Sequence, residues 1–154
     1  MSVYLIWGSL IVTGVGVILE GISTAITGIQ STKTIDPSKR NMLLASSALV
    51  GFGTILMIIA LILLFMYQTK SKFKQSKGLG IAALVFGILA VACFIPGAVL
   101  AGVLSQRYAD EPIVANALKT AGILSAIGLA HLFLGYGLLY FAIGQRIKKA
   151  TGKK

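Results

Sequence analysis

Four long apolar stretches limit what this chain can fold into more than any other feature of its sequence. They cover residues 3–29, 42–67, 79–104 and 118–144. A helix needs roughly 20 predominantly apolar residues to cross the hydrocarbon of a bilayer, and none of the stretches alternates like a membrane β-strand. The sequence therefore predicts an all-α, polytopic membrane protein: a single domain, residues 1–154, with a four-transmembrane-helix bundle and a basic tail at 145–154.

The low content of charged residues indicates that lipid surrounds most of this chain. Charged residues make up 12% of the sequence and hydrophobic residues 56%, whereas soluble domains carry about 25% charged residues. A water-soluble fold of this size could not cover its surface with so few charges. We therefore expect an integral membrane protein whose first partner is the lipid bilayer.

The distribution of lysine and arginine predicts how the four helices are oriented. An even number of spans places both termini on one side of the membrane, together with the connector between the second and third spans. That side carries nine cations and no acidic residue, whereas the opposite side carries five cations and three acids. Because cytoplasmic loops are enriched in lysine and arginine, we predict that both termini are cytoplasmic.

Residue types that support catalysis or metal binding are scarce. The sequence contains one histidine and one cysteine, so neither an internal disulfide nor a cluster of histidine ligands can form. It also lacks the familiar nucleophile, phosphate-binding and zinc-protease motifs. We therefore predict that the protein is not an enzyme and binds no metal ion and no cofactor.

Two ionisable residues lie inside the predicted spans. Glu20 lies four residues beyond the middle of the first span, and His131 lies near the middle of the fourth. A charged side chain at that depth costs roughly 3 kcal/mol or more, so both should face protein or water. If the first and fourth helices touch, the two side chains can meet and carry a proton or an ion. In the alternative interpretation, Glu20 bonds to hydroxyl groups or to a partner helix, and His131 bonds to a backbone carbonyl group.

Small residues recur every seven positions in the first and fourth spans. They are Gly14, Gly21 and Gly28 in the first span and Ala121, Gly128, Gly135 and Ala142 in the fourth. A seven-residue period keeps one stripe of a helix facing its neighbour, and small residues let membrane helices approach closely. We predict that the two stripes pack together within the bundle, or alternatively against copies of the protein.

A proline and a glycine interrupt the third span at Pro96 and Gly97. Proline removes one backbone hydrogen bond and clashes with the preceding turn, so a kink is expected there. The kink could be a passive bend or a hinge.

Basic residues cluster on the side predicted to be cytoplasmic. They include Lys70, Lys72, Lys74 and Lys77 in the second connector and Arg146, Lys148 and Lys149 in the tail. Each attracts anionic headgroups by about 1 kcal/mol, so we expect contact with anionic lipids or with an acidic partner. Aromatic residues that could stack on bases are scarce there, so no specific binding of nucleic acid is expected.

These features favour a structural or assembly function. The chain is expected to be a non-enzymatic four-helix subunit of a larger membrane complex or of a virion membrane layer. It would contact other membrane proteins or copies of itself. The alternative is a small transporter or channel, coupled to protons or ions through Glu20 and His131.

Overall fold

Four long helices make up the protein in the computed structural model, which describes the backbone of residues 2–69 and 77–151 and the side chains of residues 4–67 and 78–142. The helices are α1 (Ser2–Lys33), α2 (Pro37–Thr69), α3 (Lys77–Arg107) and α4 (Pro112–Thr151). Each predicted span lies within one helix, and the described residues form no strand. All four helices are long and apolar enough to cross a membrane. The prediction of an all-α four-helix bundle is therefore confirmed.

Proline marks the start of two of the helices. Asp36 precedes Pro37, and its Oδ1 atom accepts a hydrogen bond from the backbone nitrogen of Ser38 (2.9 Å). This is an N-cap, followed by proline at the first helical position, where no donor is lost. Glu111 likewise precedes Pro112, and its carbonyl oxygen accepts a hydrogen bond from the backbone nitrogen of Ala115 (2.9 Å). Both Pro-containing connectors thus turn the chain into a new helix.

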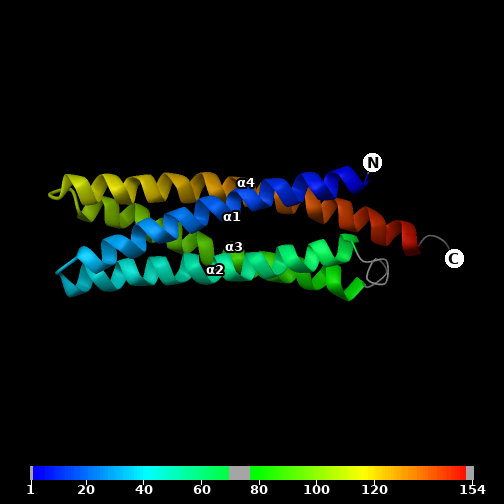
Figure 1. Ribbon diagram of the computed structural model, residues 1–154, viewed down its shortest axis with the longest axis horizontal. Helices are drawn as coiled ribbons and strands as arrows, with labels where there is room; N and C mark the ends of the chain where they lie inside the picture. The colour runs from blue at the N-terminus through cyan, green and yellow to red at the C-terminus, as the bar shows by residue number, and fades with distance from the viewer. Residues whose placement is uncertain (1, 70–76, 152–154) are drawn as a thin grey trace.

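The helices form an elongated bundle in which sequence neighbours run antiparallel (Figure 1). The closest pairs are α1 with α4 and α2 with α3; α1 also packs on α2, and α3 on α4. Helix α1 begins, and α4 ends, at the end of the bundle where α2 ends and α3 begins (Figure 1). This agrees with the expectation that an even number of spans places both termini on one side.

Buried positions on the helices are separated alternately by three and four residues, except at the end of α1, where two successive steps are four residues long. On α4 the buried residues are Leu118, Ala121, Ser125, Gly128, Leu132, Gly135, Leu139 and Ala142. Helices α2 and α3 repeat the same spacing. A mean period of 3.5 residues is typical of helices that pack at a shallow, left-handed crossing angle, and the buried residues of this bundle follow that spacing.

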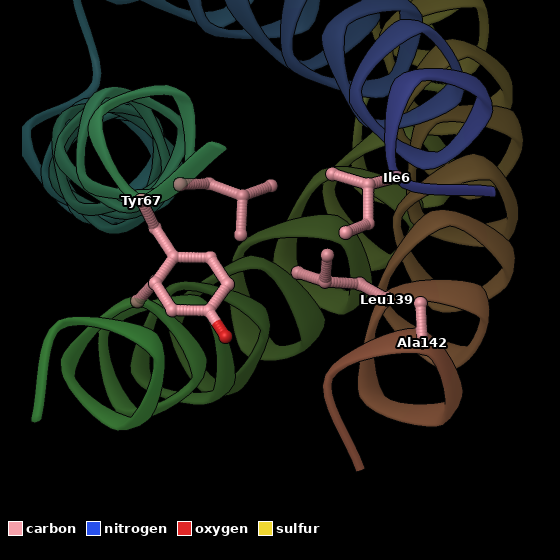
Figure 2. Close-up of a cluster of buried hydrophobic side chains, with 6 residues drawn as sticks. Ile6, Tyr67, Leu139 and Ala142 are labelled. Atoms are coloured by element: carbon pink, nitrogen blue, oxygen red, sulfur yellow. The ribbon is translucent and has the colours of Figure 1, made fainter. Parts of the chain in front are cut away.

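Apolar side chains fill the bundle in three layers along its length. In the layer nearest the start of α1, Ile6 and Leu139 point into the space enclosed by the four helices, and Tyr67 enters it from α2 (Figure 2). The middle layer is centred on Met57 and Phe94. The layer at the opposite end contains buried residues of α2, α3 and α4.

Large apolar side chains also cover the outside of the bundle. Examples are Ile11, Ile18, Phe52, Ile88, Val99 and Phe133, each at least half exposed. Small residues, by contrast, occupy many of the buried positions. This distribution suits membrane helices, which pack through small residues while large side chains face lipid.

Candidate functional site

The buried face of α1 is polar over most of its length. Its members are Ser9, Thr13, Gly16, Glu20, Ser23, Thr27 and Ser31, which we call the polar seam. Among the described residues of α1, Ile6 is the one that belongs to a buried apolar cluster. Helix α4 packs along the seam, so this row of hydroxyl groups and one carboxyl group is held inside the protein.

Glu20 lies at the centre of the polar seam and is fully buried. The hydroxyl group of Ser125 on α4 donates a hydrogen bond to its Oε2 atom (2.7 Å). The other oxygen, Oε1, is buried and has no hydrogen-bond partner among the described residues. A buried polar atom without a partner is uncommon in folded proteins and calls for an explanation.

The absence of side chains at Gly16 and Gly128 leaves space for the Glu20 side chain between α1 and α4. A Cβ atom added to Gly128 would lie 3.1 Å from Oε1 and 3.2 Å from the carbonyl oxygen of Gly16. A Cβ atom added to Gly16 would lie 2.9 Å from the carbonyl oxygen of Gly128. The backbones of α1 and α4 therefore meet directly at this depth, and the carboxyl group is enclosed between them.

The hydroxyl groups of the polar seam are all hydrogen-bonded to backbone carbonyls. Ser23 donates across the interface to the carbonyl oxygen of Ala121 (3.0 Å). Ser9, Thr13, Thr27 and Ser31 donate to carbonyl oxygens of α1 itself, three or four residues earlier. Each hydroxyl oxygen keeps lone pairs that can accept a further hydrogen bond. The hydroxyl groups of the seam are therefore satisfied without water, yet they can also accept hydrogen bonds from it.

His131 and Glu20 do not form the pair that the sequence allows. Helices α1 and α4 do touch, but the Nδ1 atom of His131 lies 2.8 Å from the carbonyl oxygen of Ile127 on its own helix. His131 is half-buried, one position along from Leu132, which faces the core. No hydrogen bond or salt bridge joins the two side chains among the described residues. The alternative interpretation, a bond from His131 to a backbone carbonyl, matches the structure.

The glycine stripe predicted on α1 does not make the contact with α4. A Cβ atom added to Gly14 or Gly21 would meet nothing within 4 Å, and one added to Gly28 would lie 3.3 Å from the hydroxyl oxygen of Ser47 on α2. The contact is made instead through Gly16 and Glu20. A seven-residue period shows that a stripe exists on a helix, but it does not show which of several stripes faces the neighbouring helix. On α1 the stripe that faces α4 is the one that carries the buried polar side chains.

The stripe predicted on α4 does lie at the interface. Ala121, Gly128, Gly135 and Ala142 are all buried, and Gly135 lies against the backbone of Ser9 and Thr13. Ser125 lies on the same buried face and was missed as a partner of Glu20. The signal for it was available, because Ser125 continues the spacing of three and four residues through Ala121 and Gly128.

Alanine substitutions can separate the two glycine positions on α1. Gly16→Ala is expected to lower the free energy of unfolding by about 1–3 kcal/mol, the typical effect of overpacking, because the new methyl group meets the Gly128 carbonyl. Gly14→Ala is expected to be neutral or slightly stabilising, because alanine favours helix more than glycine and the site is open. Unfolding by sodium dodecyl sulfate titration in mixed micelles measures both. Equal effects would contradict the observed interface.

Helix α3 continues through Pro96 without ending. The neighbouring Gly97 is buried at the contact with α2, where its carbonyl oxygen accepts a hydrogen bond from the Ser46 hydroxyl (2.9 Å). A Cβ atom at Gly97 would collide with the Val50 side chain. The Pro96–Gly97 step is therefore a site of close packing between α2 and α3, and a hinge there stays a prediction.

The predicted lipid-contact residues lie outside the described side chains. Lys70, Lys72 and Lys74 fall between α2 and α3, in residues that are not described. Lys77, Arg146, Lys148 and Lys149 lie on helices, but their side chains are not described either. Their contact with anionic lipids stays a prediction.

Comparisons with protein families, curated proteins and solved structures find none similar to this chain. The function is therefore argued from the bundle itself.

Proposed function

We propose that this protein is a non-enzymatic assembly subunit of a membrane complex, which acts by receiving the transmembrane helices of its partners or of its own copies. The observation that carries the proposal is an apolar groove between α1 and α2 on the outside of the bundle. The groove has a volume of about 390 Å³, and its lining consists of Trp7, Leu10, Ile11, Ile58, Leu61, Ile62 and Phe65.

The shape and chemistry of this groove suit an apolar helix. Trp7 and Phe65 meet edge to face at one end, with ring centroids 6.2 Å apart and an interplanar angle of 77°. Edge-to-face contact is a preferred arrangement of aromatic rings and contributes about 0.5–1.5 kcal/mol, so this pair helps to hold α1 and α2 together at that end of the groove. Large side chains such as Ile11 and Ile62 remain more than half exposed, and van der Waals packing of side chains is one of the forces that associate membrane helices.

The competing proposal, transport through a Glu20–His131 pair, has less support. Glu20 is hydrogen-bonded to Ser125, and His131 is hydrogen-bonded to a carbonyl group of its own helix. Glu20 is also fully buried, so water does not reach it in this arrangement. The outer groove therefore provides the better basis for a primary function.

Site-specific photo-crosslinking in native membranes tests the assembly function. A photoreactive amino acid at Ile62, in the groove, is expected to join the chain to a second polypeptide, which mass spectrometry identifies as a partner or another copy. Phe133 is a matched control on α4, because it is exposed to a similar extent (58% against 54% for Ile62) but does not line the groove. It should yield lipid adducts.

Two outcomes would refute the proposal. If both positions give lipid adducts alone, the groove does not receive a protein helix. If both positions give protein adducts in equal yield, crowding in the membrane explains the contacts and the groove has no special role.

A further inference from the structure

The polar seam is long enough to cross the hydrocarbon of a bilayer. It runs from Ser9 to Ser31, and at the helical rise this distance is about 33 Å, close to the roughly 30 Å thickness of the hydrocarbon core. The apolar layers of the core contain buried residues from the other helices all along the bundle. The buried face of α1 therefore differs from those of the other helices, because it carries a row of hydroxyl groups where they carry mainly apolar side chains.

Glu20 stands near the middle of this row and differs chemically from its neighbours. It is the one member of the polar seam whose side chain is an ionisable acid. Its Oε2 atom accepts a hydrogen bond from Ser125, whereas the buried Oε1 atom has no partner among the described residues. A neutral carboxylic acid carries its proton on one oxygen and can accept with the other, so the Ser125 hydrogen bond to Oε2 is compatible with both the neutral acid and the carboxylate.

Among the described residues, no lysine, arginine or histidine side chain forms a salt bridge or hydrogen bond with Glu20. Residues 4–32 of α1 and 41–67 of α2 contain no lysine, arginine or histidine. On α4, Lys119 is exposed, His131 is hydrogen-bonded to a carbonyl of its own helix, and the Tyr136 hydroxyl group donates a hydrogen bond to a carbonyl of α3. An isolated buried carboxylate is unfavourable in a membrane, so a change in the charge of Glu20 must involve an opening of the surroundings.

We propose that the polar seam is a pathway for protons, in which Glu20 is the carrier and the contact between Gly16 and Gly128 is the closed gate. When α1 moves away from α4, water enters beside the seam hydroxyls, which accept hydrogen bonds from it. The Glu20 carboxylate takes a proton from a hydronium ion in the water on one side, which leaves a water molecule, and becomes the neutral acid. It then returns the proton to water on the other side, and Ser125 donates to Oε2 in both states.

Reconstitution into liposomes tests this pathway. Liposomes that contain a pH-sensitive dye are given a pH gradient and a potassium diffusion potential set with valinomycin. The wild-type protein is expected to carry protons faster than the leak of protein-free liposomes. Glu20→Gln should return the rate to that leak, because the amide keeps the shape and still accepts the Ser125 hydrogen bond but carries no titratable proton. Glu111→Gln, at an exposed position, should keep the wild-type rate.

A hydroxyl substitution and a chemical label provide independent measurements. Thr27→Val removes one hydroxyl of the seam with little change in volume and should slow the flux, whereas Thr120→Val, at an exposed position of α4, should leave it unchanged. Dicyclohexylcarbodiimide reacts with protonated carboxyl groups in apolar surroundings. It should block the wild-type flux and label the peptide that contains Glu20.

The proposal is overturned if the wild-type protein adds no flux to the liposome leak, or if Glu20→Gln keeps the wild-type rate. Neither result would affect the crosslinking at Ile62, so the failure of the proton pathway and that of the assembly function are distinguishable.

Discussion

Replacement of Gly135 by alanine is expected to destabilise the bundle strongly, with a decrease of about 2–3 kcal/mol in the free energy of unfolding, near the upper end of overpacking effects. The added Cβ atom would collide with the Thr13 hydroxyl and would lie 3.0 Å from the backbone nitrogen of Thr13 and 3.1 Å from the carbonyl oxygen of Ser9. The hydroxyl can rotate, but the two backbone atoms belong to α1 and can move only with the helix. Helices α1 and α4 must therefore separate.

Gly137 provides the matched control, two residues along the same helix. A Cβ atom there would meet nothing within 4 Å, so Gly137→Ala should be neutral or stabilise the protein by up to about 1 kcal/mol, through helix propensity. Unfolding titrations of the two variants in the same mixed micelles make the comparison. If Gly135→Ala is as stable as Gly137→Ala, the close approach of α1 and α4 at this position is wrong.

The four helices could be predicted from the sequence because bilayer thickness sets the length of a span. Each apolar stretch had to be long enough to cross, and the polar connectors marked the ends. The structure extends each helix beyond its apolar stretch, as in α2, where Pro37 and the Asp36 cap add a turn before the span begins. Hydropathy does not record such turns, because they depend on local capping.

The neighbours of Glu20 could be predicted only in part. Its burial follows from the unfavourable energy of a charged group in lipid, and its proximity to α4 follows from the small residues on that helix. The rotation of α1 about its own axis does not follow from either. Two stripes, one through Gly14 and Gly21 and one through Gly16 and Glu20, have the same period, and only the contacts of α4 distinguish them. The similar depths of His131 and Glu20 allow the two side chains to meet. In the structure, however, the His131 side chain lies beside the buried face of α4 and is hydrogen-bonded to its own helix.

A second large effect is expected at the contact between α3 and α4. Gly87 lies under the ring of Tyr136, and an added Cβ atom would overlap that ring. The Tyr136 hydroxyl group donates a hydrogen bond to the carbonyl oxygen of Ala83 (3.2 Å), and its ring packs against two of the apolar layers. Gly87→Ala must push the ring out of this place, and we expect a loss of about 2–3 kcal/mol from overpacking and the broken hydrogen bond.

A double-mutant cycle identifies the cause of that loss. Tyr136→Leu alone should destabilise the protein, because it removes the hydrogen bond and part of the packing. In the double variant Gly87→Ala/Tyr136→Leu the new methyl group has room where the ring was. The double variant should therefore be more stable than the sum of the single effects predicts, with a coupling of about 1 kcal/mol or more, as found for residues in contact. Gly102→Ala, an open glycine on α3, should show no coupling to Tyr136→Leu. Additive effects at Gly87 would mean that the ring of Tyr136 does not lie over it.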